Sequence, residues 1–166
     1  MAEITRLRWP DDGPRVLDLC ERAKDYIQLE TGKDPDRAYV KETMIDAPPS
    51  VPPEHIWCWG HAQSGGALDG LATCLKGYYG PKDWYLGLLL LDPAARGAGL
   101  GERIARHVIE EARQDAADCV RIAVLDANPR ARVFWERLGF EHETSTSRGD
   151  GQLRHVHRLP LKKDRT

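Results

Sequence analysis

The stretch LLLLDPAARGAGLGERIARH, residues 88–107, constrains the possible folds of this chain more than any other. An apolar run ends at Asp92, and three glycines at alternate positions precede a segment with helical periodicity. Leu100, Ile104 and Val108 lie on one stripe of that segment, because an α-helix has 3.6 residues per turn. The stretch therefore predicts a buried strand that passes through a glycine-rich turn into an amphipathic helix.

The segments around this turn extend the pattern into a β-α-β unit. The run 84–91 does not alternate with polar residues, which indicates a strand covered on both faces. An apolar run at 119–125 predicts a second strand, and a strand, a helix and a strand in this order are typical of a parallel pair. Asn128 and Gly139 then fit the two caps of a last helix at 129–138.

The remaining periodicity predicts further elements on either side of this unit. Helices are expected at 14–31 and 36–45, followed by a proline-rich loop. Strands are expected at 4–9, 55–61, 68–78, 140–143 and 153–159, with a hairpin turn at 63–66. The sequence contains no internal repeat or long linker, so we expect one domain over residues 1–166.

The composition is that of an ordinary globular chain and argues against several classes of protein. With 166 residues and a net charge of −2, the chain has no basic field that would attract nucleic acid or an anionic membrane. Its apolar segments stay short of the roughly 20 residues of a membrane span, and its N-terminus lacks a signal-peptide core. The four cysteines have no metal-binding or redox spacing, so we expect reduced thiols, no metal and a cytoplasmic location.

The glycine turn suits an anion. A helix N-terminus presents free N–H groups and a partial positive charge, and glycines let a phosphate approach the backbone without meeting a Cβ atom. Arg96 adds a cation beside the turn. The alternative is that the glycines serve only a tight turn and close helix packing. The turn fits neither G-x-x-x-x-G-K-[ST] nor G-x-G-x-x-G, so the two common nucleotide motifs are absent.

The turn does fit the pattern R-x-x-G-x-G, in Arg96, Gly99 and Gly101. Downstream, Asn128 is followed by ARVFWERLGF, residues 131–140. The two motifs in this order resemble the GCN5-related N-acetyltransferase family. The resemblance implies an α/β fold (α+β by some schemes) with a mixed, mostly antiparallel twisted sheet. About seven strands, about four flanking helices and a splayed, parallel central strand pair are expected.

The resemblance also implies acetyl-CoA as co-substrate and an amine as acceptor. The diphosphate would meet the N–H groups of the glycine turn, and the pantetheine arm would pair with the strand at 89–91. A backbone N–H near Leu91 would stabilise charge on the thioester oxygen while the amine attacks directly. The implied cofactor-binding residues are Leu89, Leu90, Leu91, Arg96, Gly97, Ala98, Gly99, Leu100, Gly101, Glu102, Asn128 and Trp135.

Two catalytic side chains of the family have no counterpart in this chain. Many members carry a tyrosine seven residues after the asparagine as general acid, where this chain has Trp135. Some carry a glutamate five residues before it, where this chain has Ala123. An indole N–H donates hydrogen bonds but is not an acid, so Trp135 is expected to pack against the arm or to hold a water. The candidates for a catalytic base are Asp83, Tyr85, Tyr79 and Glu54.

Three hypotheses follow for the function. The leading one is an acetyl-CoA-dependent N-acetyltransferase that acts on a primary amine of a small molecule or a peptide, in a chain that can form a homodimer. The second is an acyl-CoA-binding module without catalysis, which the substitutions at Trp135 and Ala123 keep open. The third is an unrelated α/β phosphate-binding protein. Thiol release in the presence of amines distinguishes the first hypothesis from the other two.

Overall fold

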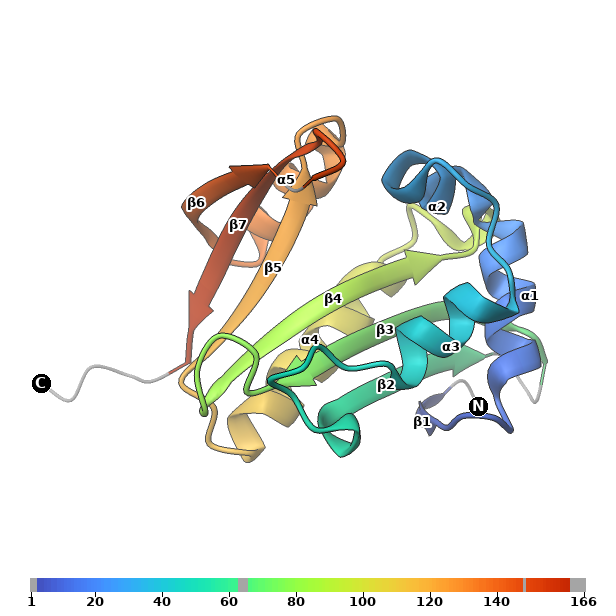
Figure 1. Cartoon of the computed structure of the whole chain (residues 1–166), viewed down its shortest axis with the longest axis horizontal. Helices are drawn as coiled ribbons and strands as arrows, with labels where there is room; N and C mark the ends of the chain where they lie inside the picture. The colour runs from blue at the N-terminus through green and yellow to red at the C-terminus, as the bar shows by residue number, and fades with distance from the viewer. Residues whose placement is uncertain (1–2, 63–65, 148, 162–166) are drawn as a thin grey trace, which may run out of the picture.

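The computed structural model describes residues 3–62, 66–147 and 149–161. Seven strands form one sheet in the order β1-β2-β3-β4-β5-β7-β6, in which β4 and β5 are parallel and the other neighbours antiparallel (Figure 1). The strands are β1 (Glu3–Leu7), β2 (Ile56–Ala62), β3 (Leu68–Lys76), β4 (Asp83–Leu91), β5 (Cys119–Leu125), β6 (Glu141–Ser147) and β7 (Leu153–Pro160). The expected mixed sheet with a parallel central pair is confirmed.

Helices cover both faces of the sheet (Figure 1). The helices are α1 (Gly13–Arg22), α2 (Lys24–Thr31), α3 (Arg37–Ile45), α4 (Leu100–Gln114) and α5 (Pro129–Arg137), with short 3-10 turns η1 (Pro53–His55) and η2 (Pro93–Ala95). Apolar residues of α1, α2 and α3 form one buried cluster with one side of the sheet, and those of α4 and α5 form a second cluster with the other side. The sheet therefore has an apolar core on each face, as in other layered α/β folds.

The predicted single helix at 14–31 is wrong. The chain forms two helices, because Ala23 leaves the helical conformation with φ −103° and ψ 27°. No glycine or proline marks this break, and the apolar spacing runs through it. Ala23 is fully buried, and Arg22 beside it bonds to Asp92 and to the carbonyl of Leu68. Long-range contacts therefore fix the end of α1, and the break redirects α2 toward the ends of β4 and β5 (Figure 1).

The predicted elements near the C-terminus are confirmed in part. The strand at 119–125 and both caps of α5 are as expected: Asn128 accepts a hydrogen bond from the N–H of Ala131, and Gly139 has φ 97°. In contrast, β6 is longer than the expected strand at 140–143 and all its residues are exposed. This strand is stabilised by its pairing with β7 and not by burial of an apolar face. Its hydrophobic pattern therefore gave little information on where the strand ends. Residues 63–65 of the predicted hairpin turn lie outside the described residues.

The pairing of β4 with β3 shifts register in the middle of β4. Thr73 lies opposite Leu88 and Cys74 opposite Leu86, so Gly87 is an extra residue on β4 and forms a β-bulge. The bulge reverses the alternation of the strand: Leu86 packs in the cluster of α4, whereas Leu88 packs in the cluster of α1–α3. Beyond the bulge Leu88 and Leu90 pack in the cluster of α1–α3, whereas Leu89 and Leu91 pack against the cluster of α4, so the leucine run is covered on both faces.

The central strands separate beyond the bulge. Parallel pairing of β4 with β5 extends only from Asp83 and Cys119 to Leu86 and Ile122. Both strands continue past these residues without pairing to each other, to the ends given above. The expected splay of the central pair is therefore present, and it begins at Gly87 on the β4 side. The figure shows the resulting V between the two strands (Figure 1).

All four cysteines are buried free thiols. Burial raises the pKa of Cys20 and of Cys58 to about 12, from an ordinary value of 9.0, because the thiolate loses its hydration. Within the described ranges, no His, Cys, Asp and Glu side chains come together as a metal site. The helices described there are also too short or too polar to cross a membrane.

We expect the protein to lose stability steeply above pH 9. A thiol whose pKa is higher in the folded state binds its proton more tightly there, so its stabilisation is complete below pH 9 and is lost as pH rises toward 12. The slope is up to about 1.4 kcal/mol per pH unit for each thiol. Urea unfolding from pH 8 to 11 measures it, and Cys20→Ala is expected to flatten the slope. Equal slopes in both proteins would contradict this explanation.

Candidate active site

A cleft of about 510 Å³ lies between the separated parts of β4 and β5. Its floor and walls come from residues 86–91 of β4, residues 122–125 of β5, the first turns of α2 and α5, and the turn before α4. The residues that line the cleft include Asp25, Tyr26, Gly87, Leu88, Leu89, Leu91, Arg96, Gly97, Gly101, Ala123, Leu125, Asn128, Arg130, Phe134 and Trp135. The cleft is therefore a direct consequence of the splay.

Helix α4 begins beside this cleft, and the N–H groups of its first turn are uncapped. Its N-cap is Gly99, which has no side chain to accept a hydrogen bond, and the N–H of Arg103 is the first to bond to the Gly99 carbonyl, at 3.1 Å. The N–H groups of residues 100–102 thus have no acceptor within the helix. The side chains of Leu100 and Glu102 turn elsewhere, into the core and onto Arg106 respectively. The turn can accept an anion at its backbone.

The glycines of the turn leave room for that anion. Gly97 has φ 83° and Gly99 has φ 86°, and a Cβ atom at either position would meet nothing within 4 Å. A second hollow of about 340 Å³ begins there, lined by both glycines, Gly101 and residues of α5. Gly101 has a different reason to be small, because its Cβ would touch Leu91 and Phe134, at 3.4 and 3.6 Å. The structure therefore shows close packing at Gly101 and open space at Gly97 and Gly99, where anion binding stays a prediction.

Arg96 bonds to a carboxylate rather than standing free. Its Nη1 lies 2.8 Å from Asp25 Oδ2, its Nη2 lies 3.1 Å from Asp25 Oδ1, and Nη2 also reaches the carbonyl of Leu91. These hydrogen bonds hold the pKa of Asp25 below its usual range and raise the pKa of Arg96. The pair joins α2 to the turn across the mouth of the cleft. The sequence did not predict it, because the two residues are 71 positions apart.

Backbone N–H groups of β4 face the open side of the strand. The N–H of Asp92 donates to the carbonyl of Asp69 on the β3 side, at 2.9 Å. Because N–H groups alternate sides along a strand, those of Leu89 and Leu91 point the other way, toward the gap that β5 leaves. The strand therefore offers the cleft a row of donors and acceptors to which an extended ligand can pair.

Asn128 and Trp135 close the cleft on the α5 side. The side-chain oxygen of Asn128 caps α5 by accepting from Ala131, at 3.2 Å, which leaves its amide nitrogen as the group for a ligand. Trp135 is buried, with ring centroids of Phe134 and Phe140 at 4.9 and 5.1 Å. Trp135 therefore packs on rings of the protein itself, and its packing against the arm stays a prediction.

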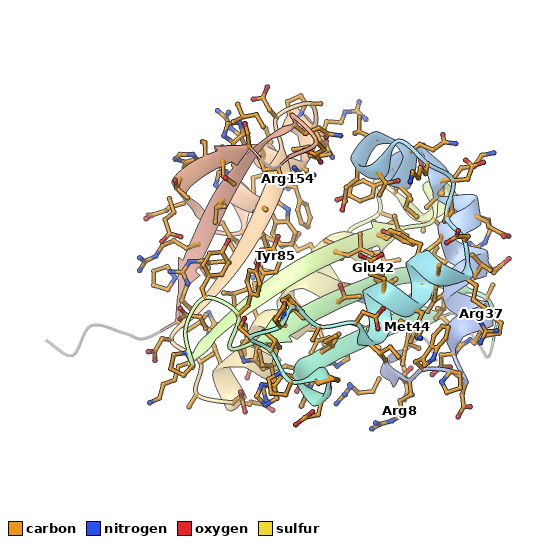
Figure 2. All side chains as sticks on the ribbon, in the orientation of Figure 1. Arg8, Arg37, Glu42, Met44, Tyr85 and Arg154 are labelled. Carbon is orange, nitrogen blue, oxygen red and sulfur yellow. The ribbon has the colours of Figure 1, made fainter. Side chains whose placement is uncertain are left out.

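A further pocket of about 380 Å³ opens on the other side of β4. It shares five residues with the cleft, so the two spaces meet where β4 bulges: Tyr26, Gly87, Leu88, Ala123 and Leu125. The lining of this pocket also includes Glu30, Tyr39, Glu42, Asp46, Thr73, Tyr78, Tyr85 and Arg154. Figure 2 shows Tyr85, Glu42 and Arg154 around this opening, on β4, α3 and β7. We call it the acceptor pocket.

The candidate bases take different positions relative to these spaces. Tyr85 lines the acceptor pocket. Asp83 is not among the residues that line any of the three spaces, and its carboxylate bonds to Arg121 at 2.8 Å. Tyr79 and Glu54 lie outside the linings as well, and half of the Tyr79 side chain is exposed. The sequence did not indicate Thr73 or Glu42 as site residues, since no local motif connects them.

Comparison with known proteins identifies the family. The model of the acetyltransferase (GNAT) family matches residues 7–140. The chain belongs to this family. Acetyltransferases of this family use acetyl-CoA as acetyl donor. The glycine turn, the splayed strands and the cleft between them are the parts of this acetyltransferase that have room for that donor. Family membership rules out the hypothesis of an unrelated phosphate-binding protein.

Similar proteins are known in sequence and in structure. The acetyltransferase is 38% identical over 52 residues to a probable glucosamine 6-phosphate N-acetyltransferase 2 of Oryza sativa subsp. japonica, a match that covers 31% of this chain and 30% of that protein. Its fold is similar to that of an acetyltransferase from Thermus thermophilus, with a TM-score of 0.77, 21% identity and 97% of both chains covered. It is also similar to the ribosomal-protein-S18-alanine N-acetyltransferase of Escherichia coli, with a TM-score of 0.75, 18% identity and coverage of 100% and 99%.

We expect the Trp135→Phe acetyltransferase to keep kcat within about fivefold of the wild type, because an indole transfers no proton and phenylalanine preserves the ring packing. The cost to the free energy of unfolding is expected to be about 1 kcal/mol. Steady-state thiol release and urea unfolding measure the two quantities. A folded variant whose kcat falls by about 100-fold or more, as after loss of a general acid, would overturn the packing role.

Proposed function

We propose that this acetyltransferase transfers the acetyl group to a primary amine of a small molecule or a peptide, by direct attack across β4. The observation that carries the proposal is the meeting of two spaces at the bulge. The cleft with uncapped N–H groups lies on one side, and the acceptor pocket lies on the other, with Gly87 in both linings. Bound acetyl-CoA supplies a thioester carbonyl carbon for the amine and a thiol as leaving group.

The turn before α4 holds the diphosphate in this proposal. The N–H groups of residues 100–102 donate to it, with Gly97 and Gly99 giving access. Arg96 contributes its charge after exchanging Asp25 for a phosphate. The Arg96 and Asp25 side chains are 40% and 61% exposed, and such exposed pairs contribute only about 0–1 kcal/mol, so the exchange costs little. Ala98, Leu100 and Glu102 take part through their backbone.

The arm of the co-substrate pairs with β4 between the turn and the bulge. Leu91 lies four residues from Gly87, which is about 13 Å along a strand, whereas Leu89 lies about half as far away. We therefore assign the N–H of Leu91 and the carbonyl of Leu89 to the neighbourhood of the arm, and the N–H of Leu89 to the thioester oxygen. The N–H and carbonyl of Leu90 face β3 and take no part. A backbone donor aimed at that oxygen stabilises the charge that develops there. Asn128 and Trp135 bound the arm from α5.

The amine enters from the acceptor pocket and must lose a proton. An alkylammonium with a pKa near 10.4 is about three units from neutral at pH 7, which costs roughly 4–5 kcal/mol. Tyr85 orients the amine by a hydrogen bond, and the carboxylates of the pocket receive the proton directly or through water. The departing thiol has an ordinary pKa of about 8.5, so it needs no strong acid. We assign no part in the transfer to Asp83.

The test is release of free thiol from acetyl-CoA when the purified protein is given a panel of amines. The panel holds alkylamines, amino sugars and peptides with free N-termini or lysines. We expect amine-dependent release together with one acetylated product that mass spectrometry identifies. Tight binding of acetyl-CoA without release from any amine would refute the proposed transfer. The Thr73→Val variant serves as a control for the acceptor side, since it leaves the cofactor cleft intact.

A further inference from the structure

We infer that the acceptor is a small aliphatic diamine or polyamine, a molecule with a second cationic centre besides the amine that is acetylated. The inference rests on the proposed function, because it assigns the pocket beside β4 to the acceptor. It goes beyond that function by naming the class of acceptor from the charges, rings and buried polar groups of this pocket.

The charged side chains of the acceptor pocket are mainly acidic. Glu30, Glu42 and Asp46 line it, from α2, α3 and the residue after α3. Across the part of the chain that the structure describes, the carboxylates of Glu42 and Asp46 form no hydrogen bond or ion pair. Two carboxylates at the rim of a cavity attract a cation, and neither is neutralised by the protein.

The one basic residue that lines the pocket does not offset this charge. Arg154 is buried, and its guanidinium forms two hydrogen bonds to Asp150, at 2.8 and 3.2 Å. This pair lowers the pKa of Asp150 to about 2, chiefly through the hydrogen bonds from Arg154, so both groups stay charged and compensate each other. An acceptor that carries a phosphate or a carboxylate would thus meet acidic groups without an available cation in the described lining.

The walls of the pocket suit an alkylammonium. Tyr26, Tyr39, Tyr78 and Tyr85 line it from three sides, and aromatic faces attract cations by about 0.5–2 kcal/mol in partly dry sites. Burial and the hydrogen bond to Glu30 raise the pKa of Tyr26, so its phenol stays neutral. Methylene groups of a diamine can pack on these rings while its charged ends reach the carboxylates.

The deep end of the pocket offers a polar group for the reacting amine. Thr73 is only 7% exposed and lines the pocket, and its hydroxyl lies 3.8 Å from the position of a Cβ atom on Gly87. Among the described residues no hydrogen-bond partner of this hydroxyl is found. This oxygen keeps some exposure to the pocket, unlike the fully buried atoms without partners elsewhere in the described residues, so a ligand atom at the bulge can bond to it.

The two ends of the combined site therefore have opposite charge. The cleft that faces the anionic co-substrate has a net positive lining of Arg96, Arg130 and Asp25, whereas the acceptor end has a net negative lining of Glu30, Glu42, Asp46 and Arg154. Such complementarity selects partners by charge and suppresses wrong ones. It favours a dication over amino sugar phosphates, the substrates named for the curated relatives.

The experiment compares 1,4-diaminobutane, n-butylamine, 4-aminobutanoate and glucosamine 6-phosphate as acceptors at saturating acetyl-CoA. We expect kcat/KM for the diamine to exceed that for n-butylamine by about tenfold, through KM, and to fall with added salt. In the Glu42→Gln, Asp46→Asn double variant this preference is expected to vanish, and it is read from the ratio of the two kcat/KM values, in which a loss of activity common to both amines cancels. Glu21→Gln, an exposed carboxylate outside the pocket, is the matched control.

The outcomes separate the inference from the proposed function. Turnover of n-butylamine without preference for the diamine, or a preference for either anionic amine, overturns the inference and leaves the proposed function standing. An unchanged preference in the double variant also overturns it. If no amine causes release of thiol from acetyl-CoA, the proposed function is overturned. The inference is then decided by calorimetric titration of the four amines into the protein loaded with CoA. Equal affinity for diamine and monoamine in that titration is the negative result.

Discussion

The Gly99→Ala protein is expected to bind acetyl-CoA about 30–150-fold more weakly than the wild type, a loss of roughly 2–3 kcal/mol for hydrogen bonds to a charged group. A methyl group at residue 99 meets no protein atom within 4 Å, so it projects into the hollow before α4. There it keeps an anion from the N–H groups of residues 100–102. Titration calorimetry with acetyl-CoA and with CoA measures the loss.

The matched control is Gly32→Ala. Gly32 has φ 73° at the end of α2, again with open space around its Cβ, and it lines none of the three spaces. Both variants are expected to lose about 1–2 kcal/mol of stability, because a side chain at positive φ is strained. Gly32→Ala is expected to bind the co-substrate normally. Equal affinity in the two folded variants would refute the diphosphate site.

The Gly87→Val protein is expected to fold at least as stably as the wild type and to lose about 100-fold or more in kcat/KM, the effect of displacing a reacting group from alignment. Gly87 is exposed on β4 without positive φ, and a Cβ there meets only Tyr85 at 3.4 Å and Thr73 at 3.8 Å. Valine suits a strand better than glycine does. Its methyl groups would stand where the cleft and the acceptor pocket meet.

The graded variant Gly87→Ala tests the steric cause. Its smaller side chain is expected to give a smaller loss of kcat/KM, with CoA affinity nearly unchanged in both variants, since the diphosphate site lies at the other end of the cleft. Circular dichroism and urea unfolding show whether each variant is folded. A Gly87→Val protein with normal turnover would mean that the amine does not reach the thioester beside the bulge.

The cofactor side of the site could be predicted from the sequence because its parts are local. A strand, a glycine turn and a helix N-terminus follow one another over residues 88–107, and their backbone chemistry depends on neighbours within one or two turns. The cap at Asn128 and the left-handed Gly139 are local in the same way. Residues at these positions can be identified without knowledge of the rest of the fold.

The acceptor side could not be predicted because its residues are distant from one another in the sequence. Glu42 on α3, Thr73 on β3 and Arg154 on β7 come together only when the sheet is assembled. Each is unremarkable in its own segment, and none belongs to a motif. The Arg96–Asp25 pair is a similar case, since it depends on the break at Ala23 that turns α2 toward the cleft.

The sequence by itself determined that free backbone N–H groups stand at one strand–helix junction, beside glycines that leave them open. Hydrophobic period, caps and glycine conformation act over a few residues, and a single segment contains them. Only the tertiary structure decided that the expected splay of β4 from β5 begins at a bulge at Gly87 and opens one space to each side. Strand register and bulges arise from packing across the whole sheet, so no local pattern records them.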